Sequence, residues 1–568
     1  MNTVEQWKQD KHPLDVIDDV YEYAHEGLTF DEIEARAGEG EWERLKWAGL
    51  YTHGQHQGYF MLRTKVPGGY LTPEQAEVIG TVAEEFATAP EAFGGSEQNE
   101  EWGDGFLDIT TRQDVQMHWI EIEDIPEIWK RYDAVGLTTV QGCGDGARNV
   151  LGCPVAGLDD HECFDAQPVV NAVSDFFTGN REYANLPRKF KMTITGCRED
   201  CAQSQINDVG LIPAKRRIDG EWYYGFHARV GGGLSDGPRM ASPLDVFVPP
   251  EDTVEFCRAI AQVFKELGDR HNRGVCRMRY LVEQLGPETF EQAVRDRCSV
   301  PLRDRGVDLT EGYTGDHVGV HEQKDDGLSY VGFNVVAGRI GGSEFASAAR
   351  AARRYGTDEA SVRLATEQNF LLSHVPNDAT DDLISEPFAA EYQPDPGPFS
   401  RGAVGCTGSE FCNYGIIETK QRVKQWAREL DDRIETPEDL DVVRMHMSGC
   451  SASCAQPQIA DIGFRGETVT ITDPDRSSND EGDTIVEGMD FGLGGSLGVD
   501  NAFIDWVETA VPAEAVIPAL EQLFAVYAEE RADGERFYEW CRRVDNDRLR
   551  TLMQRADAPV SRGVSHGD

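Results

Sequence analysis

Two segments of the chain repeat one another: GCREDCAQSQINDVG at residues 196–210 and GCSASCAQPQIADIG at residues 449–463. They align without a gap, at an offset of 253 residues. Downstream, residues 231–234 (GGGL) have a counterpart in 494–497 (GGSL). Upstream, Gly68-Gly69 matches Gly341-Gly342, and a helical stretch follows each pair. One long duplication is unlike the short period of a solenoid. It therefore predicts two related halves that face each other with a site between them.

Local patterns predict a mixed α+β fold. Residues 60–66 alternate as a strand that ends at Pro67-Gly68-Gly69, and a helix then begins at Thr72-Pro73-Glu74-Gln75. The second half repeats this order with a strand over 331–336, Gly341-Gly342 and a helix. Residues 189–195 and 442–447 alternate as strands that lead into the two Cys segments. We expect residues 471–482 to form an inserted loop and 556–568 to form a disordered tail.

The charge balance is strongly acidic, with 101 Asp and Glu against 54 Lys and Arg and a net charge of −47. This excludes a general nucleic-acid role, because phosphate contacts need clustered positive charge. It is typical of an acid-coated surface that keeps a protein soluble at high salt. No apolar run is long enough for a membrane span, and the N-terminus has no signal-peptide pattern. We therefore expect a cytoplasmic protein that does not bind membranes.

Thirteen Cys are many for a cytoplasmic chain, where clustered thiols favour metal binding or catalysis over disulfides. We expect the single Cys163, Cys257, Cys276, Cys298 and Cys541 to be small buried apolar side chains. The second half carries Cys406-x5-Cys412 and, 37 residues later, Cys450-x3-Cys454. Four such thiolates can hold a 4Fe–4S cluster. A zinc site is the alternative, but it fits the wide first pair less well.

These Cys segments resemble those of nitrite and sulfite reductases. Residues 405–412 with 418–420 resemble the first arm of their cluster site, and 448–454 with 458–464 resemble the second. The likeness runs from about Trp47 to Arg550. It implies a 4Fe–4S cluster bound by Cys406, Cys412, Cys450 and Cys454 and coupled to a siroheme through Cys454. It also implies pseudo-twofold halves, each a ferredoxin-like α/β half-domain plus a larger α+β domain.

This resemblance divides the chain into five segments. The first ferredoxin-like half-domain lies in 1–135 and the first repeat, with the anion and siroheme side, in 136–305. The second half-domain occupies 306–395, the cluster-bearing repeat 396–555, and a tail 556–568.

The same resemblance assigns an anion site to the first half. Arg112, Arg148, Lys189 and Lys191 would surround the substrate, because Arg binds oxyanions and Lys can relay protons. Gln116, His118, Asn149 and Arg188 would contact the cofactor. We expect residues 110–118 to be strand-like, with Arg112 and Gln116 on one face, and Lys189 and Lys191 to share a strand face.

The repeats differ in a way that separates two tasks. Thr111-Arg112-Gln113 has Thr366-Glu367-Gln368 as its counterpart, and residues 189–191 have 443–445. One half would therefore hold the anion and the other the cluster. Lys191 favours sulfite slightly, because a second cation suits a dianion. Nitrite as the main substrate is the alternative.

The predicted reaction is a six-electron reduction at siroheme, of sulfite to sulfide or of nitrite to ammonia. No nicotinamide- or flavin-binding segment is evident, so reduced ferredoxin is the expected donor, and we expect a monomer. Two further alternatives are a precorrin-modifying monooxygenase of similar fold and a non-catalytic iron–sulfur protein.

Four Cys of the first half leave a question open. Cys143-x9-Cys153 and Cys197-x3-Cys201 could bind a second metal, but a remnant of duplication or local packing is the favoured interpretation. We expect Gly231-Gly232-Gly233 to allow close approach of a tetrapyrrole.

Overall fold

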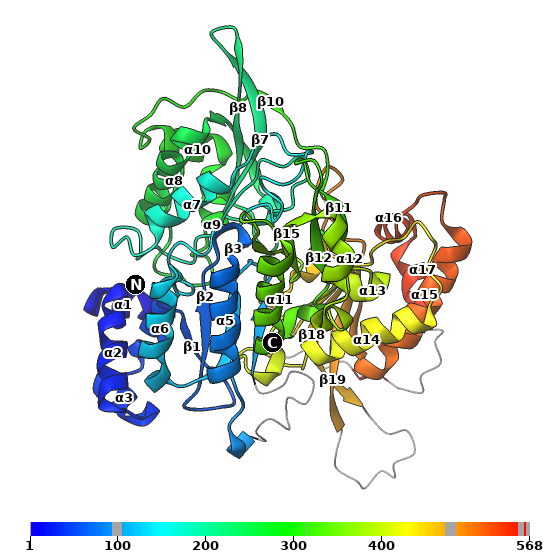
Figure 1. The fold of residues 1–568 in the computed structure, drawn as a ribbon, viewed down its shortest axis with the longest axis horizontal. Coiled ribbons are helices and arrows are strands. Elements are labelled where there is room, and N and C mark those ends of the chain that lie inside the picture. Colours follow the sequence, from blue (N-terminus) through cyan, green and yellow to red (C-terminus); the bar gives the residue numbers. More distant parts are fainter. Residues whose placement is uncertain (1, 94–104, 314, 472–483, 555–561, 564–568) are drawn as a thin grey trace. The chain divides into compact units, whose positions relative to one another are not determined.

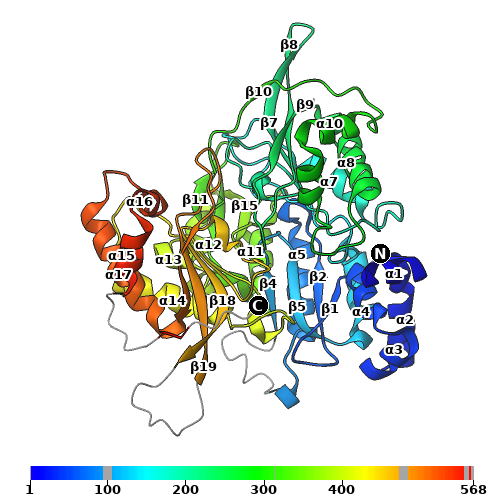
Figure 2. The ribbon, with the colours of Figure 1, turned by 180° about the vertical axis from the view of Figure 1, so that it is seen from behind.

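A computed structural model describes residues 2–93, 105–313, 315–471, 484–554 and 562–563 (Figures 1 and 2). The chain forms two compact units. Unit 1 comprises Met1–Gly233 and Pro238–Pro394, and unit 2 comprises Leu234–Gly237 and Asp395–Asp568. The division into five segments stays a prediction. The expected loop over 471–482 and the expected tail over 556–568 fall almost wholly outside the described residues.

The N-terminal helices of unit 1 form a small bundle (Figure 1). They are α1 (Thr3–Asp10), α2 (Val16–Glu26), α3 (Phe30–Ala37), α4 (Gly40–Arg44) and α6 (Ile125–Ala134). Val16, Val20 and Tyr23 recur at helical spacing on α2 and are buried. Thr29 begins α3 with a capping box to Glu32, which satisfies two backbone donors.

Two five-stranded antiparallel sheets form the ferredoxin-like part of unit 1. One has the order β1-β2-β5-β4-β13 and the other β11-β12-β15-β14-β3. The first half supplies β1 (Leu50–Thr52), β2 (Phe60–Thr64), β3 (Tyr70–Leu71), β4 (Phe106–Ile109) and β5 (Val115–Ile120). The second supplies β11 (Gly319–Glu322), β12 (Leu328–Phe333), β13 (Arg339–Gly341), β14 (Val362–Leu364) and β15 (Phe370–Pro376). Each half thus donates one strand, β3 or β13, to the other half's sheet.

The helices of this part are α5 (Pro73–Phe86), α11 (Gly342–Tyr355) and α12 (Thr380–Ile384). Helices α5 and α11 lie side by side in both views (Figures 1 and 2). A Cβ on Gly80 would come within 2.6 Å of the Gly342 carbonyl oxygen, so both glycines allow this close approach. The predicted helix at Thr72 is confirmed, with Thr72 and Gln75 forming its capping box.

The tight turn before each exchanged strand corrects our alignment of the halves. Gly68 (φ 62°) and Ala337 (φ 60°) occupy the same left-handed position in turns of matching geometry. The counterpart of Gly68-Gly69 is therefore Ala337-Gly338, and not Gly341-Gly342. The strand expected over 331–336 also ends at Phe333, because this turn follows it.

The first repeat builds a third sheet in unit 1, with the order β10-β7-β8-β9 and β6 paired to β7. Its strands are β6 (Met192–Ile194), β7 (Val209–Ile218), β8 (Glu221–Val230), β9 (Ser242–Val248) and β10 (Val307–Asp308). Its helices are α7 (Gln167–Phe177), α8 (Thr253–Leu267), α9 (Met278–Leu285) and α10 (Pro287–Arg295). Strands β7 and β8 extend as a long hairpin (Figure 1).

Unit 2 repeats this architecture, with the order β16-β17-β18-β19-β20 and β21 paired to β18. Its strands are β16 (Ala403–Gly405), β17 (Met445–Ser448), β18 (Ile462–Ile471), β19 (Thr484–Leu493), β20 (Asp505–Pro512) and β21 (Arg562–Gly563). Its helices are α13 (Pro398–Arg401), α14 (Lys420–Arg433), α15 (Val516–Glu530), α16 (Phe537–Arg543) and α17 (Asn546–Gln554). Met192 pairs in parallel with Val209, and Met445 with Ile462, so the duplication is confirmed at the register predicted by the Cys segments.

Among the described residues, none of the helices has both the length and the apolar character needed to cross a membrane.

Candidate functional site

Arg112 lies in a tight turn between β4 and β5. Gln113 has a left-handed backbone (φ 55°), and its N–H donates to the Thr110 carbonyl oxygen at 3.0 Å. Our expectation of a strand over 110–118 is therefore wrong for its first five residues, since β5 begins only at Val115. The turn, rather than strand alternation, determines where Arg112 points.

The Arg112 guanidinium is held by two hydrogen bonds. It donates to Asn207 Oδ1 at 2.8 Å and to the Asn149 carbonyl oxygen at 2.7 Å. Asn149 is itself fixed, because its amide donates to the carbonyl oxygens of Val66 and Arg112 at 2.7 and 3.0 Å. Burial lowers the pKa of Arg112 to about 9, with Asp114 opposing the shift and Arg148 adding to it. The structure thus brings Arg112, Arg148 and Asn149 together.

Two further arginines, one on a loop and one on β2, donate to the same carbonyl oxygen. Arg148 donates to the Gly142 carbonyl oxygen from Nε at 3.0 Å and from a terminal nitrogen at 2.6 Å. Arg63 on β2 reaches the same oxygen at 3.4 Å and Cys143 Sγ at 3.3 Å. The buried Asp114 interacts electrostatically with Arg63, Arg112 and Arg148, although its burial still raises its pKa. Its single charge leaves these cations incompletely neutralised.

Lys189 and Lys191 precede β6, and Lys191 faces this same group. Burial lowers the pKa of Lys191 well below its usual range, and Arg112, Lys189 and Arg277 lower it further. The Lys191 backbone N–H donates to Asp208 at 2.9 Å. Hence all four predicted anion-binding residues form one cation group in unit 1.

The second repeat shows a register that differs from our alignment by one residue. The Arg444 N–H donates to Asp461 just as the Lys191 N–H donates to Asp208. The counterpart of Lys191 is therefore Arg444, whereas we had aligned it with Met445. Arg444 also forms an ion pair with Asp461 at 3.2 Å, so its charge is neutralised within unit 2.

The other predicted cofactor contacts lie in different surroundings. Gln116 is buried on β5. On the same strand, His118 Nδ1 lies 3.2 Å from His53 Nε2, and its Nε2 lies 3.4 Å from Asp108. Arg188 forms an ion pair at 3.0 Å with the buried Asp145.

Several polar atoms of the cation group suit an external anion. Arg112 Nε and Arg277 Nε are buried donors that have no hydrogen-bond partner within the described part of the chain. Unsatisfied buried donors of this kind are costly. The carboxylates of a siroheme would supply acceptors for the two arginine nitrogens, so these residues fit that cofactor.

The four thiols of unit 2 lie near one another, and their binding of the cluster stays a prediction. Cys406 and Cys450 each interact electrostatically with Cys454, and Cys450 also interacts with Cys412. Backbone N–H groups donate to sulfur, from Gly449 to Cys406 at 3.2 Å and from Tyr414 to Cys412 at 3.4 Å. Such bonds stabilise cluster thiolates. Cys454 is exposed and the other three are partly buried, which fits a thiolate shared with a second cofactor.

One expectation about the first repeat is corrected. Cys143 lies beside Arg63 and outside the thiol group formed by Cys153, Cys197 and Cys201, so the proposed pair of Cys143 with Cys153 is wrong. A Cβ on Gly232 would lie 2.6 Å from the Gln205 carbonyl oxygen, so packing against the chain already favours glycine there. Close approach of a tetrapyrrole to residues 231–233 stays a prediction.

Sequence reasoning missed Arg63 and Arg277. Arg277 forms an ion pair with Asp208 at 3.1 Å and lies close enough to affect Lys191. Neither residue belongs to a repeated motif, and the sequence carries no signal that either one joins the cation group.

Two known families match most of the chain. A family described as "Nitrite and sulphite reductase 4Fe-4S domain" matches residues 143–302 and 397–559, and one described as "Nitrite/Sulfite reductase ferredoxin-like half domain" matches 53–135 and 321–390. The chain belongs to the nitrite and sulphite reductase family. It is therefore an oxidoreductase, and the predicted siroheme and 4Fe–4S cofactors, like the predicted duplicated α+β fold, are confirmed.

Relatives within this family cover nearly the whole chain. The assimilatory ferredoxin-dependent nitrite reductase of Haloferax mediterranei is 39% identical over 94% of this chain and 90% of its own length. The ferredoxin–nitrite reductase of Synechococcus elongatus is 37% identical over 92% of this chain and 96% of its own length. The solved structure of the Mycobacterium tuberculosis NirA protein is 32% identical, with a TM-score of 0.84 over 97% of each chain.

Proposed function

We propose that this reductase converts nitrite to ammonium with electrons from reduced ferredoxin. The cation group around Arg112 carries the proposal, because it offers an oxyanion several donors in a chain that is otherwise strongly acidic. Relatives named ferredoxin–nitrite reductases, similar along almost the entire chain, support both the substrate and the donor. The slight preference for sulfite that we drew from Lys191 finds no such support, so the nitrite alternative takes its place.

Electrostatics weakens the argument for sulfite. That argument counted Lys191 as a full second cation. Burial and three neighbouring cations lower its pKa well below the usual range, so its ammonium form is less favoured than that of an exposed lysine.

The predicted site residues would have different roles in this reaction. The overall change is NO₂⁻ + 6 e⁻ + 8 H⁺ → NH₄⁺ + 2 H₂O, and a bound siroheme and cluster would pass on the electrons of reduced ferredoxin one at a time. Arg112 and Arg148 hold the oxyanion. Lys189 and Lys191 deliver protons, and the lowered pKa of Lys191 makes its ammonium group a stronger acid than that of an exposed lysine. We assign Gln116, His118, Asn149 and Arg188 to the siroheme side.

Steady-state kinetics with reduced ferredoxin and each anion tests the proposal. We expect kcat/KM for nitrite to exceed that for sulfite at least tenfold. A larger value for sulfite would contradict it. Light scattering on the same sample tests the expected monomer, since a dimer would double the mass.

Lys191→Asn tests the role of this lysine in substrate choice. Removing a residue that can become a cation should lower kcat/KM for sulfite more than for nitrite, so the sulfite-to-nitrite ratio should fall several-fold. The ratio should be unchanged in Arg217→Asn, which alters an exposed cation on the β7–β8 hairpin. An unchanged ratio in Lys191→Asn would remove the lysine from substrate discrimination.

A further inference from the structure

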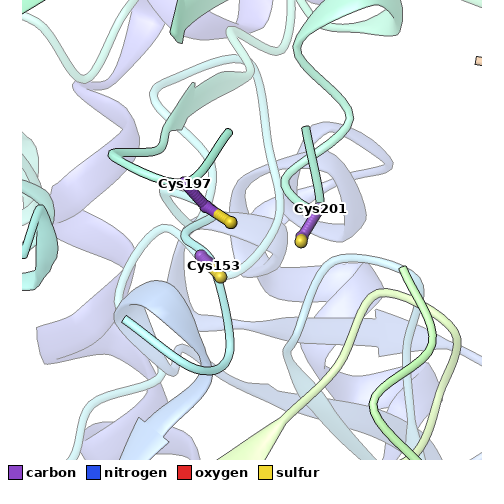
Figure 3. A group of neighbouring side chains, drawn as sticks. All are labelled: Cys153, Cys197 and Cys201. Atoms are coloured by element: carbon purple, nitrogen blue, oxygen red, sulfur yellow. The ribbon is translucent and has the colours of Figure 1, made fainter. Parts of the chain in front are cut away.

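Three buried thiols meet in unit 1 away from the four cluster thiols. The Sγ atoms of Cys153, Cys197 and Cys201 all lie within 4.8 Å of one another, and none belongs to a disulfide. Their sulfurs point toward one another, Cys153 from one loop and Cys197 and Cys201 from another (Figure 3). In the part of the chain that the structure describes, this is the one group of three or more such ligands so closely spaced.

The duplication gives these thiols a clear origin. The parallel bridge between Leu151 and Thr193 matches the pairing of Val404 with His446 at the offset of 253 residues. Cys153, Cys197 and Cys201 therefore correspond to the cluster ligands Cys406, Cys450 and Cys454. The fourth ligand, Cys412, has Asp159 at the matching position. The first repeat thus keeps three of the four ligand positions.

The backbone around the three thiols has the form found at the cluster ligands. In unit 2 the N–H two residues after the thiol donates to sulfur at Cys406, Cys412 and Cys450. The same bond forms in unit 1, from Val155 to Cys153 and from Glu199 to Cys197. Since N–H donors stabilise a metal-bound thiolate, both repeats retain a backbone suited to metal binding.

His317 supplies a candidate fourth ligand. Its side chain is 8% exposed, and Nε2 has no hydrogen-bond partner among the described residues. The ring interacts electrostatically with Cys197, so the two lie near each other. Its ring centroid is 6.2 Å from that of Tyr330, which packs in the same apolar cluster as the three thiols. An unpartnered buried imidazole beside three thiols is a ligand set typical of zinc.

The spacing distinguishes one metal ion from a second cluster. Tetrahedral zinc with Zn–S bonds of about 2.3 Å places its sulfurs roughly 3.8 Å apart. A cubane spreads its cysteine sulfurs further, because each one binds a different iron. No three of the four described cluster thiols in unit 2 meet the 4.8 Å spacing, whereas the unit 1 thiols do.

We infer that Cys153, Cys197, Cys201 and His317 bind one zinc ion as a structural site. The ion would join the two Cys loops of the first repeat to the segment before β11 of the second ferredoxin-like sheet. Binding releases the thiol protons and transfers no electron, so the site needs no redox partner. It is independent of the anion chemistry proposed above.

Metal analysis of the purified full-length holoenzyme tests this inference. We expect close to one zinc per chain, with at most four irons in the cluster besides the siroheme iron. Cys201→Ala and His317→Ala should each lower zinc at least fivefold while the siroheme spectrum persists. Cys298→Ala, which removes a partly buried thiol elsewhere in unit 1, should retain it.

A second measurement covers the case in which Cys201→Ala fails to fold. In the wild-type protein, Co²⁺ exchanged for zinc should give sulfur-to-cobalt charge-transfer absorption, which His317→Ala should shift. Less than a tenth of a zinc per folded wild-type chain would overturn the inference. So would a second set of cluster iron that is lost in Cys201→Ala, or a disulfide between two of the three cysteines.

Discussion

Anion binding by Arg112 depends on the planar arrangement of its guanidinium N–H donors as much as on its positive charge. Its two hydrogen bonds, to Asn207 and to the Asn149 carbonyl, fix the direction in which the guanidinium faces an anion. Arg112→Lys keeps the charge but cannot reproduce this planar geometry. We expect the nitrite KM to rise about tenfold to a hundredfold, with a smaller change in kcat, in steady-state assays.

The matched control for this variant is Arg217→Lys at the exposed end of β7, which should leave both constants unchanged. If the KM of Arg112→Lys equals that of the wild type, Arg112 does not contact the anion.

His446 on β17 should make unit 2 sensitive to acid. Burial, assisted by Arg444, lowers its pKa to about 3, so the folded state holds the neutral ring while the unfolded state protonates near pH 6.5. The unfolded state therefore binds more protons between these values, and stability falls as the pH drops below 6.5. At pH 5, protonation of His446 in the unfolded state lowers the free energy of unfolding by about 2 kcal/mol.

His446→Asn should keep a donor for the Gln456 carbonyl oxygen, which lies 3.2 Å from Nδ1, and remove the titration. Its melting temperature should fall less between pH 7 and pH 5 than that of the wild type. The exposed His161→Asn is the control. Equal losses in wild type and His446→Asn would exclude His446 as the cause.

At the scale of elements, the sequence predicted the duplication because the Cys segments must keep both their ligands and their register. It misaligned the turns before the exchanged strands because Ala337 occupies a left-handed position where Gly68 stands in the first half. An alignment that matches glycine to glycine misses an alanine in this position. The turn at Arg112 was missed similarly, since Gln113 is left-handed without being Gly, Asn or Asp.

Hydrogen bonds from the side chains of Gln113 and Gln368 join the two ferredoxin-like halves of unit 1. Gln113 Nε2 donates to the Leu364 carbonyl oxygen at 2.7 Å, and Gln368 Nε2 donates to that of Ile109 at 2.9 Å. Gln113→Asn is too short to make this bond. We expect it to lower the free energy of unfolding of unit 1 by about 1–3 kcal/mol, because buried groups lose their partners.

Chemical denaturation of the full chain measures this loss. Gln292→Asn removes an exposed side-chain bond to Asp296 and should change stability by no more than about 0.5 kcal/mol. If Gln113→Asn lowers the free energy of unfolding no more than this control does, the hydrogen bonds between the two halves do not stabilise the fold.

For the whole molecule, the sequence predicted the cofactor thiols better than the anion group. Cys spacing is a local signal, and all four thiols of unit 2 interact as expected. The cation group combines residues from β2, three loop segments and the segment before α9, so long-range folding alone adds Arg63 and Arg277. A lone arginine in a sequence of this composition carries no mark of such a role.

The net charge of −47 should make the whole protein salt-dependent. Self-repulsion disfavours the compact state, and raising the ionic strength from 0.1 to 1 M shortens the screening length from about 10 to 3 Å. In a chain of 568 residues, each kcal/mol of repulsion relieved raises the melting temperature by about 1 °C. We therefore expect a rise of several degrees between 0.1 and 1 M KCl, measured by differential scanning fluorimetry.

A variant that removes four exposed carboxylates separates screening from other effects of salt. Asp10→Asn, Asp358→Asn, Asp432→Asn and Glu529→Gln alter exposed residues, so little packing is lost. The net charge becomes −43, and repulsion weakens already at low salt. The variant should melt higher than the wild type in 0.1 M KCl, and the difference should narrow in 1 M KCl. An equal salt-dependent rise in both proteins would mean that KCl stabilises this reductase by something other than screening its acidic surface.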